Sequence, residues 1–401
     1  MRCNNGHCAV GEYSNALILF TSKKGLLMKL TYFFLAALAL GTSAMYAADS
    51  TTAAPAATPV TYTGFVDAYY SYNFANPNSM TNEFRNFDLA ENQFVLSLAE
   101  LVIQKTASPI GFRMDIDYGK TNDIVQSGGA STLNFLQQAY VTAVLPWGSG
   151  LTVDVGKFVT HMGYEVIESN GNWNYSRSFM FAYSIPYYHT GMRLTYPVSS
   201  TFTAALHIVN GWNGVLDNNK DKSVGLQLVY NPTASTGITF SGMMGNEQPT
   251  GAPSFTLGGS PYTNTDVAEI IVTQTVNDNL SLALDADYGQ VRAVPNGGGS
   301  GTGAPLSIWK GVAVYGRYTL DSLTALALRL ETYNDGYNTV LFNPKATLNE
   351  VTLTYERKIF GQMLARVEVR DDMSNVPAFD KNALATEKGQ VTGLVGLVVA
   401  F

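Results

Sequence analysis

The stretch QVTGLVGLVVAF, residues 390–401, closes the sequence with apolar residues at nearly every second position. Side chains of an extended strand point alternately to its two faces, so Val391, Val395 and Leu397 share one face with the terminal Phe401. That face consists only of apolar residues and glycine. Soluble proteins rarely end on such a strand, whereas a sheet that faces lipid requires one. We therefore predict a strand whose outer face meets an apolar environment.

The same alternation recurs upstream, with apolar side chains on one face and charged ones on the other. In FRMDIDY, residues 112–118, the charged residues Arg113, Asp115 and Asp117 all face away from the apolar ones. Comparable stretches are HTGMRLTY (189–196), SVGLQLVY (223–230), LSLALDADY (280–288) and QMLARVEVR (362–370). Almost nothing after residue 62 follows the period of a helix. The sequence therefore predicts an all-β chain.

Short and long links between the strands alternate along the whole chain. The short links are rich in Pro, Gly, Asn, Asp and Ser, as turns are. They lie at 106–110, 146–150, 197–200, 232–237, 277–279, 321–322 and 360–361, and the long ones at about 75–91, 119–133, 160–188, 211–222, 246–264, 290–306, 335–347 and 372–389. This alternation predicts a transmembrane antiparallel up-and-down β-barrel of about 16 strands, with short periplasmic turns and long external loops.

Other all-β architectures explain the pattern less well. A β-sandwich gives no reason for strict alternation of link length, and a soluble barrel would turn its apolar face inward. In lipid, only a closed sheet satisfies every backbone group, so the last strand must pair with the first, near residues 62–74. Strand-end tyrosines suit a girdle at the membrane interface; they are Tyr118, Tyr196, Tyr230 and Tyr288. Fourteen or eighteen strands remain the alternative counts.

The N-terminal region has the composition of a targeting segment. Met28-Lys29 precedes the apolar run LTYFFLAALALG and a stretch of small residues, so residues 28–47 are predicted to be a signal peptide, cleaved after Ala44 or Ala47. Residues 1–27 would then be an upstream extension, 48–61 a flexible lead-in and 62–401 the barrel. Four of the 24 basic and one of the 31 acidic residues precede residue 48, which leaves a net charge of about −10. Nucleic acid is therefore not an expected partner.

Two stretches together carry a resemblance to a known family. They are YTGFVDAYYSYNF (62–74) and DVGKFVTHMGYEVIESNGNWNYSRSFMFAYSIPYYHTGMRLTYP (154–197), with GFRMDIDYGK between them. The chain resembles the type 2 (OmpL-like) family of outer membrane β-barrel porins of Gram-negative bacteria, over essentially all of its length after the signal segment. The resemblance implies an outer membrane location and a pore-like role. It transfers no substrate motif to particular residues.

Catalytic and metal-binding patterns are weak in this sequence. Some outer membrane barrels are hydrolases that pair a His with Ser or Asp, and His189 follows Ser178 and Ser184 closely. No GxSxG elbow supports this, and His161, His189 and His207 lack metal-ligand spacing. The Gly-rich stretch at 295–305 lacks the ending of a phosphate loop and is predicted to be an external loop. We expect no enzymatic activity, no cofactor and no metal.

The charged faces of the strands are the predicted lining of the pore. They mix both signs, which suits small hydrophilic solutes, and their acidic excess predicts slight cation selectivity. The predicted pore-lining residues are Arg113, Asp115, Asp117, Asp154, Arg193, Asp285, Asp287, Arg317, Arg329, Glu331, Glu350, Glu356, Arg366, Glu368 and Arg370. Pairing between strand neighbours is the alternative role for many of them.

The long connection at 160–188 is unusually rich in aromatic and charged residues. We predict that it folds into the lumen and narrows the pore, with Glu165, Glu168 and Arg177 at the constriction. The alternative is a lid over the outer mouth.

The predicted function is a passive diffusion channel for small polar solutes in the outer membrane; a rim hydrolase or a surface adhesin is the alternative. Expected partners are outer membrane lipid and the barrel assembly machinery, for which the terminal Phe401 resembles an assembly signal. Association into a homo-oligomer stays open.

Overall fold

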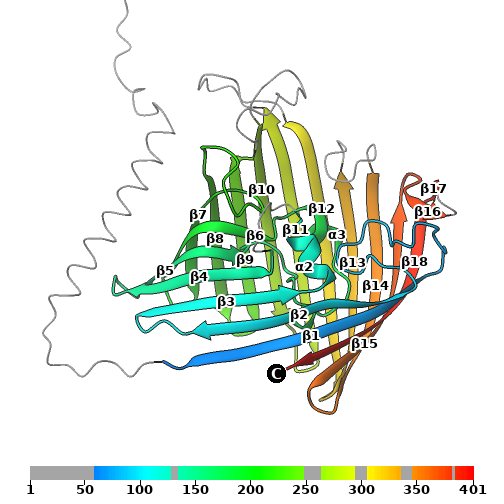
Figure 1. Ribbon diagram of the computed structural model, residues 1–401, viewed down its shortest axis with the longest axis horizontal. Helices are drawn as coiled ribbons and strands as arrows, with labels where there is room; N and C mark the ends of the chain where they lie inside the picture. Colours follow the sequence, from blue (N-terminus) through cyan, green and yellow to red (C-terminus); the bar gives the residue numbers. More distant parts are fainter. Residues whose placement is uncertain (1–57, 128–133, 248–262, 294–304, 336–345, 382–383) are drawn as a thin grey trace, which may run out of the picture. The chain divides into compact units, whose positions relative to one another are not determined.

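The protein forms a closed antiparallel barrel of sixteen strands, as the alternation of links predicts. The computed structural model describes residues 58–127, 134–247, 263–293, 305–335, 346–381 and 384–401. Each strand pairs with its neighbours in the chain, and β1 pairs with β18 to close the ring (Figure 1). The predicted extension and signal peptide, residues 48–57 of the lead-in and residues 295–304 of the Gly-rich stretch lie outside the described residues.

The elements follow one another in chain order around the barrel. The barrel strands are β1 (Val60–Asn73), β2 (Gln93–Lys105), β3 (Ile110–Tyr118), β4 (Leu136–Leu145), β5 (Leu151–Val159), β6 (Tyr188–Pro197), β7 (Phe202–Val209), β8 (Ser223–Thr233), β9 (Thr236–Asn246), β10 (Thr263–Thr275), β11 (Leu280–Ala293), β12 (Pro305–Asp321), β13 (Thr324–Asp335), β14 (Ala346–Ile359), β15 (Met363–Ser374) and β18 (Gly389–Ala400). Strands β16 (Phe379–Lys381) and β17 (Leu384–Glu387) form a separate small sheet between β15 and β18. The helical turns are α2 (Lys120–Val125), η1 (Ser169–Gly171) and α3 (Phe179–Tyr183). Among the described residues, no helix is long and apolar enough to cross a membrane.

The last strand seals the barrel along both of its edges. Strand β18 pairs with β15 on one side and with β1 on the other, where Tyr70 lies opposite Val395. Gly64 and Phe401 exchange two backbone hydrogen bonds of 3.1 and 2.9 Å, so the pairing continues to the final residue. The ring of described strands therefore has no unpaired edge, as a sheet surrounded by lipid requires.

The two faces of the wall differ in the way that the sequence pattern predicts. On β18, the side chains of Val391, Val395 and Leu397 point outward and are 39–47% exposed. The alternate residues Gln390 and Thr392 point inward and are buried. The outer face of the barrel is therefore apolar and suited to lipid.

One irregularity interrupts this alternation on β2. Asp67 lies opposite Leu98 and Ala68 lies opposite Leu96, so Ser97 is an extra residue in the ladder. Such a bulge shifts the phase of the strand by one position. Leu98 therefore points into the barrel, where it is buried.

The inside of the barrel contains a packed core that the connections supply. Phe87 from the β1–β2 connection, Val125 of α2, and Met162 and Phe181 from the β5–β6 connection belong to one buried apolar cluster with wall residues such as Phe158. Connections of the barrel thus fold inward and fill part of its lumen. Figure 1 shows α2 and α3 against the inner face of the sheet.

Candidate pore and its inserted loop

The connection between β5 and β6, residues 160–187, crosses the inside of the barrel; we call it the inserted loop. Near its start, the N–H of Gly163 donates to Glu269 on β10 at 2.6 Å. Farther along, the hydroxyl of Tyr175 donates to Asp67 on β1 at 2.7 Å. Strands β1 and β10 are far apart in the ring. The inserted loop therefore bridges the lumen between distant parts of the wall.

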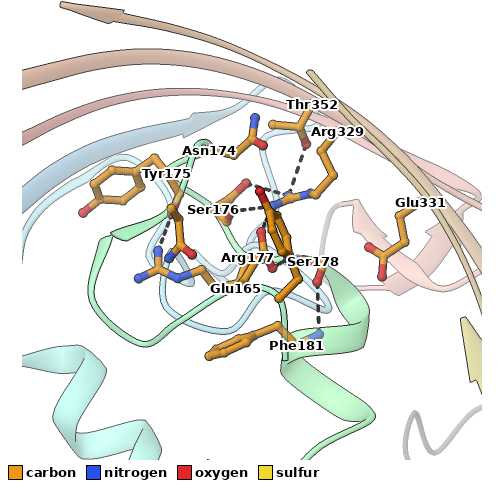
Figure 2. Close-up of polar contacts among 12 residues, drawn as sticks. Glu165, Asn174, Tyr175, Ser176, Arg177, Ser178, Phe181, Arg329, Glu331 and Thr352 are labelled. Atoms are coloured by element: carbon orange, nitrogen blue, oxygen red, sulfur yellow. Dashed lines mark hydrogen bonds and ion pairs between the residues drawn. The ribbon is translucent and has the colours of Figure 1, made fainter. Parts of the chain in front are cut away.

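Arg329 of β13 is the centre of the contact between the inserted loop and the wall. Its guanidinium donates to Glu165 and to the carbonyl of Ser176, both at 2.6 Å, and these two residues belong to the loop. It also donates to Glu350 on β14 at 2.6 Å and to the Thr352 hydroxyl at 3.3 Å. Figure 2 shows Arg329 next to the loop residues. One fully buried arginine thus joins two strands and the loop.

Glu331, two residues along the same face of β13, holds the start of α3. Its two carboxylate oxygens accept hydrogen bonds from the backbone N–H groups of Phe179 and Met180, each at 2.7 Å. These groups lack partners within the helix because they lie in its first turn. The Ser178 side chain caps the same turn by accepting from the N–H of Phe181 at 3.0 Å. The wall therefore determines where α3 begins.

Strand β15 holds the middle of the inserted loop in the same manner. Glu368 accepts from the N–H groups of Tyr175 and Ser176 at 2.7 and 3.0 Å. Arg370 donates to the carbonyl of Arg177 at 2.6 Å. Carboxylates of the wall thus bind loop donors, and its guanidinium groups bind loop acceptors. Backbone groups that are far from water obtain partners in this way.

Arg366 is a third residue of β15 that binds the inserted loop. It donates to the carbonyls of Ser169 and Asn172, both at 2.5 Å, and forms an ion pair of 2.7 Å with Glu356. Truncating one member of a buried ion pair destabilises the folded state, because its partner keeps a charge that has neither a counter-charge nor water. The buried charges therefore define a single docked position of the loop.

The structure buries two of the predicted constriction charges, Glu165 and Arg177, in the packing of the inserted loop and leaves the third, Glu168, half-buried. Arg177 is buried and donates to three carbonyls of its own loop, including that of Val166 at 3.1 Å. It also lies over the ring of Phe87, 5.1 Å from the centroid. Burial lowers the pKa of its guanidinium, which nearby Glu165 opposes, and burial raises the pKa of Glu168. Glu165 and Arg177 therefore anchor the loop and do not face an open channel, because their polar atoms are used for docking.

The predicted pore-lining residues all lie on the inner face of the wall, but they differ in exposure. The carboxylates and arginines of β13–β15 are buried against the inserted loop. Three arginines keep side-chain exposures of 33, 24 and 30%, and their carboxylate partners are much less exposed; these arginines are Arg113, Arg193 and Arg317. The buried members are Asp115, Asp117, Asp154, Asp285, Asp287, Arg329, Glu331, Glu350, Glu356, Arg366, Glu368 and Arg370. Among these described charges, the arginines thus provide most of the accessible surface.

A cavity of about 400 Å³ lies inside the barrel, across the ring of strands from β13–β15. Strands β5–β8 form its wall, and Thr160 and His161 at the start of the loop border it. Arg193 and Gln227 contribute its polar lining. The rings of His161 and His207 stack there with centroids 4.0 Å apart. Burial lowers the pKa of His161 to about 4, so this ring is neutral at pH 7.

Sequence reasoning missed that the three histidines of the barrel lie together. His161 also lies 6.0 Å from His189, between ring centroids. The ring nitrogens of His189 pair with the carbonyl of Gly211 at 2.9 Å and with the Thr160 hydroxyl at 3.2 Å. The three histidines are far apart in the sequence. They come together only because the inserted loop places His161 against the wall, which the sequence pattern does not show.

Three acidic residues lie together on β10 and β11, and only two of them, Asp285 and Asp287, were predicted from the sequence to line the pore. Glu269 lies opposite Asp287 in the sheet, and Asp285 is on the same inner face. Within the described part of the chain, these three residues are the group whose donor atoms are close enough to share a metal ion. Glu269 could have been found from the period-two pattern of TNTDVAEIIVTQT, in which it shares a face with Val267 and Ile271.

The closed wall, its apolar exterior and the internally docked loop define a β-barrel protein of an outer membrane. Residues 59–401 match the model of the family described as beta-barrel porin-2, OmpL-like, and the chain belongs to this family. It is therefore an outer membrane protein of the porin type, as the resemblance of residues 62–74 and 154–197 indicates. A comparison with curated protein sequences finds no significant match.

Solved structures of similar fold include several outer membrane proteins. The anion-selective porin from Comamonas acidovorans has a TM-score of 0.57 at 11% identity, over 86% of this chain and 100% of its own. The outer membrane channel DcaP of Acinetobacter baumannii has a TM-score of 0.56 at 11% identity, over 87% and 99%. In vitro folded OmpT of Vibrio cholerae, in a trimer form, has a TM-score of 0.55 at 11% identity, over 86% and 100%. At these identities the likeness is one of fold.

Proposed function

We propose that this protein is a passive diffusion channel for small hydrophilic solutes, with the inserted loop as its internal constriction. The observation that carries the proposal is that the charged contacts of the loop with the wall are concentrated on one part of the ring. Its charges bind the wall at β13–β15, while a polar cavity of about 400 Å³ borders it at β5–β8. Solutes would pass on the β5–β8 side, where hydroxyl, amide and imidazole groups offer exchangeable hydrogen bonds.

The charges that solutes would meet favour anions weakly. Slight cation selectivity was expected from the number of acidic residues, but most acidic groups on the inner face are buried and hydrogen-bonded. The most exposed of the predicted pore-lining charges are Arg113, Arg193 and Arg317. Since each has a carboxylate partner nearby, the resulting field is small, and we propose a mild anion preference.

Planar-bilayer recordings test the channel and its constriction together. The purified protein should give discrete open-channel steps, and a variant with residues 165–183 replaced by a short Gly-Ser link should give larger ones. Identical conductance of the two forms would contradict the constriction. Absence of steps from both would contradict the channel itself.

Selectivity is measured separately, as the reversal potential in a salt gradient. Changing Arg113, Arg193 and Arg317 together to Gln should move the reversal potential toward cation preference, because their partner carboxylates lose their counter-charges. An unchanged reversal potential would place the solute path away from these arginines.

Further proposals concern export and association. We infer that residues 28–47 direct export and are removed, that Phe401 marks the chain for the barrel assembly machinery, and that the mature barrel forms homo-oligomers. The trimer form of the structurally similar OmpT supports the last proposal. Sedimentation of the purified barrel in detergent would test it.

A further inference from the structure

We propose that Glu269, Asp285 and Asp287 bind a calcium ion at the junction of the wall and the inserted loop. The site is independent of whether the barrel conducts solutes. Glu269 of β10 and Asp287 of β11 are directly opposite each other in the sheet. Asp285 lies two residues before Asp287 on the same inner face. One donor atom from each residue lies within 4.8 Å of the others.

These carboxylates are buried and have oxygens without partners. Their residue exposures are 2, 4 and 5% in sequence order. Oε2 of Glu269 and the Oδ1 atoms of both aspartates have no hydrogen-bond partner among the described residues. Unpaired buried carboxylate oxygens are costly, and a bound cation satisfies them.

The inserted loop covers this group and supplies only part of what it needs. The N–H of Gly163 donates to Oε1 of Glu269 at 2.6 Å, and the N–H of Tyr164 reaches Oδ2 of Asp285 at 3.5 Å. The ring of Tyr164 packs on Tyr315 with centroids 4.5 Å apart. The Tyr315 hydroxyl is buried and also lacks a partner among the described residues. Because the N–H of Tyr164 reaches Asp285, this pair of aromatic rings lies near the three carboxylates.

Among the described residues, the three carboxylates lack the ion pairs that balance the charge where Arg329 contacts the inserted loop. Glu165 and Glu350 pair with Arg329 at 2.6 Å. No ion pair within the described part of the chain involves Glu269, Asp285 or Asp287. Like charges directly opposite each other destabilise a sheet. A divalent cation would turn this repulsion into attraction.

The donor chemistry favours calcium. All of the donors are oxygen atoms, which hard cations prefer over the nitrogen and sulfur ligands of zinc or copper. Calcium binds oxygen at about 2.3–2.6 Å, so two ligands on opposite sides of it are about 4.6–5.2 Å apart. The three donor atoms lie within 4.8 Å of one another, which is compatible with that span. Magnesium retains several waters and needs stricter octahedral geometry, which a buried site accommodates poorly.

The matched control is a second buried acidic pair in the same wall. Glu100 on β2 and Asp117 on β3 are directly opposite each other, and both are buried. They have unpartnered oxygens as well, but they form no three-residue group within the ligand distance among the described residues. Changing them therefore removes buried carboxylates without changing the proposed site.

Terbium(III) luminescence of the full purified barrel tests the proposal. Terbium is a calcium substitute that tyrosine can sensitise, and Tyr164 and Tyr315 lie beside the site. We expect saturable emission on excitation near 280 nm that calcium displaces. Asp287→Asn should weaken binding at least tenfold, and Asp117→Asn by less than twofold. Equal affinities for the two variants, or emission that calcium does not displace, would overturn the proposal.

A stability measurement keeps the test decisive if Asp287→Asn does not fold. Calcium at 100 times its dissociation constant should raise the melting temperature of the wild-type barrel, because it binds the folded state only. The shift should be retained in Asp117→Asn and lost in Asp285→Asn. A wild-type barrel whose melting temperature is the same in calcium and in chelator would contradict the site.

Discussion

Arg329→Gln should release the inserted loop while the barrel stays closed. The wild-type guanidinium is fully buried, and its partners include Glu165 and Ser176 of the loop and Glu350 of the wall. Removing one member of a buried ion pair costs about 3–5 kcal/mol. Most of this cost applies to the docked state, since Glu165 loses its counter-charge only there. At about 1.4 kcal/mol per factor of ten, the undocked population rises roughly 150- to 5,000-fold.

Trypsin cleavage after Arg177 reports this population. The Arg177 side chain is buried in the docked loop, so cleavage requires undocking. When undocking and redocking are fast compared with cleavage, the cleavage rate follows the open population. The 177/178 cut, identified by mass spectrometry, should therefore accelerate strongly in Arg329→Gln. Heat-modifiable electrophoretic mobility would verify that the barrel itself remains folded.

Arg113→Gln is the matched control, because its hydrogen bonds are with Asp115 on its own strand and one third of its side chain is exposed. It should leave the rate of the 177/178 cut within a few-fold of the wild type. Equal rates for Arg329→Gln and Arg113→Gln would refute the idea that buried wall charges dock the loop.

Three other changes probe different contacts. Gly396→Ala places a methyl group against the ring of Tyr175, so it should loosen docking by about 1–3 kcal/mol and speed the 177/178 cut. Gly393→Ala on the same strand should not, because its methyl group would lie 3.7 Å from the ring of Phe74, an ordinary contact. The folded-state pKa of His161, about 4, lies below the unfolded value of about 6.5, so its contribution to stability is present above pH 6.5 and falls by up to about 3 kcal/mol as the pH drops to 4. His161→Gln should remove that part of the pH dependence of the melting temperature. Phe401→Ala should reduce the amount of barrel in the outer membrane, yet inserted barrels should keep wild-type conductance; a changed conductance would assign Phe401 to the pore.

The wall of the barrel could be predicted from the sequence because lipid constrains every strand separately. Apolar side chains point outward to lipid, as those of Val391, Val395 and Leu397 do, and charged ones point inward, as those of Arg366 and Glu368 do. Both preferences appear in the sequence as an alternation with a period of two residues. The links could also be read, because short turns have a restricted composition. The bulge at Ser97 is a local departure from that period on β2.

The sequence predicted that the connection at 160–188 enters the lumen, but not which wall residues it contacts there. Period two shows that Arg329 and Glu331 point inward, but not whether water or protein meets them there. That depends on the inserted loop, whose contacts with the wall are formed by backbone N–H and C=O groups, which every sequence has. Glu165 and Arg177 were recognised as unusual in a long loop, yet their burial follows from tertiary packing alone.

The distribution of charge around the ring agrees with the concentration of charged loop contacts on one part of it. The sequences of β7, β8 and β9 contain no Asp, Glu, Lys or Arg. Strands β13–β15 carry the inward charges of Arg329, Glu331, Glu350, Glu368 and Arg370, all of them buried. A loop in the lumen has backbone groups that water cannot reach, so the wall that docks it must supply donors and acceptors. On the uncharged side, neutral groups bind the start of the loop: Gln227 of β8 and Ser241 of β9 donate to the carbonyl of His161 at 2.6 and 3.2 Å. Strands β7 and β8 border the proposed solute path, so a cysteine at Thr203 on β7, which lines the cavity, should react with water-soluble thiol reagents far faster than a cysteine at the buried Thr352 on β14.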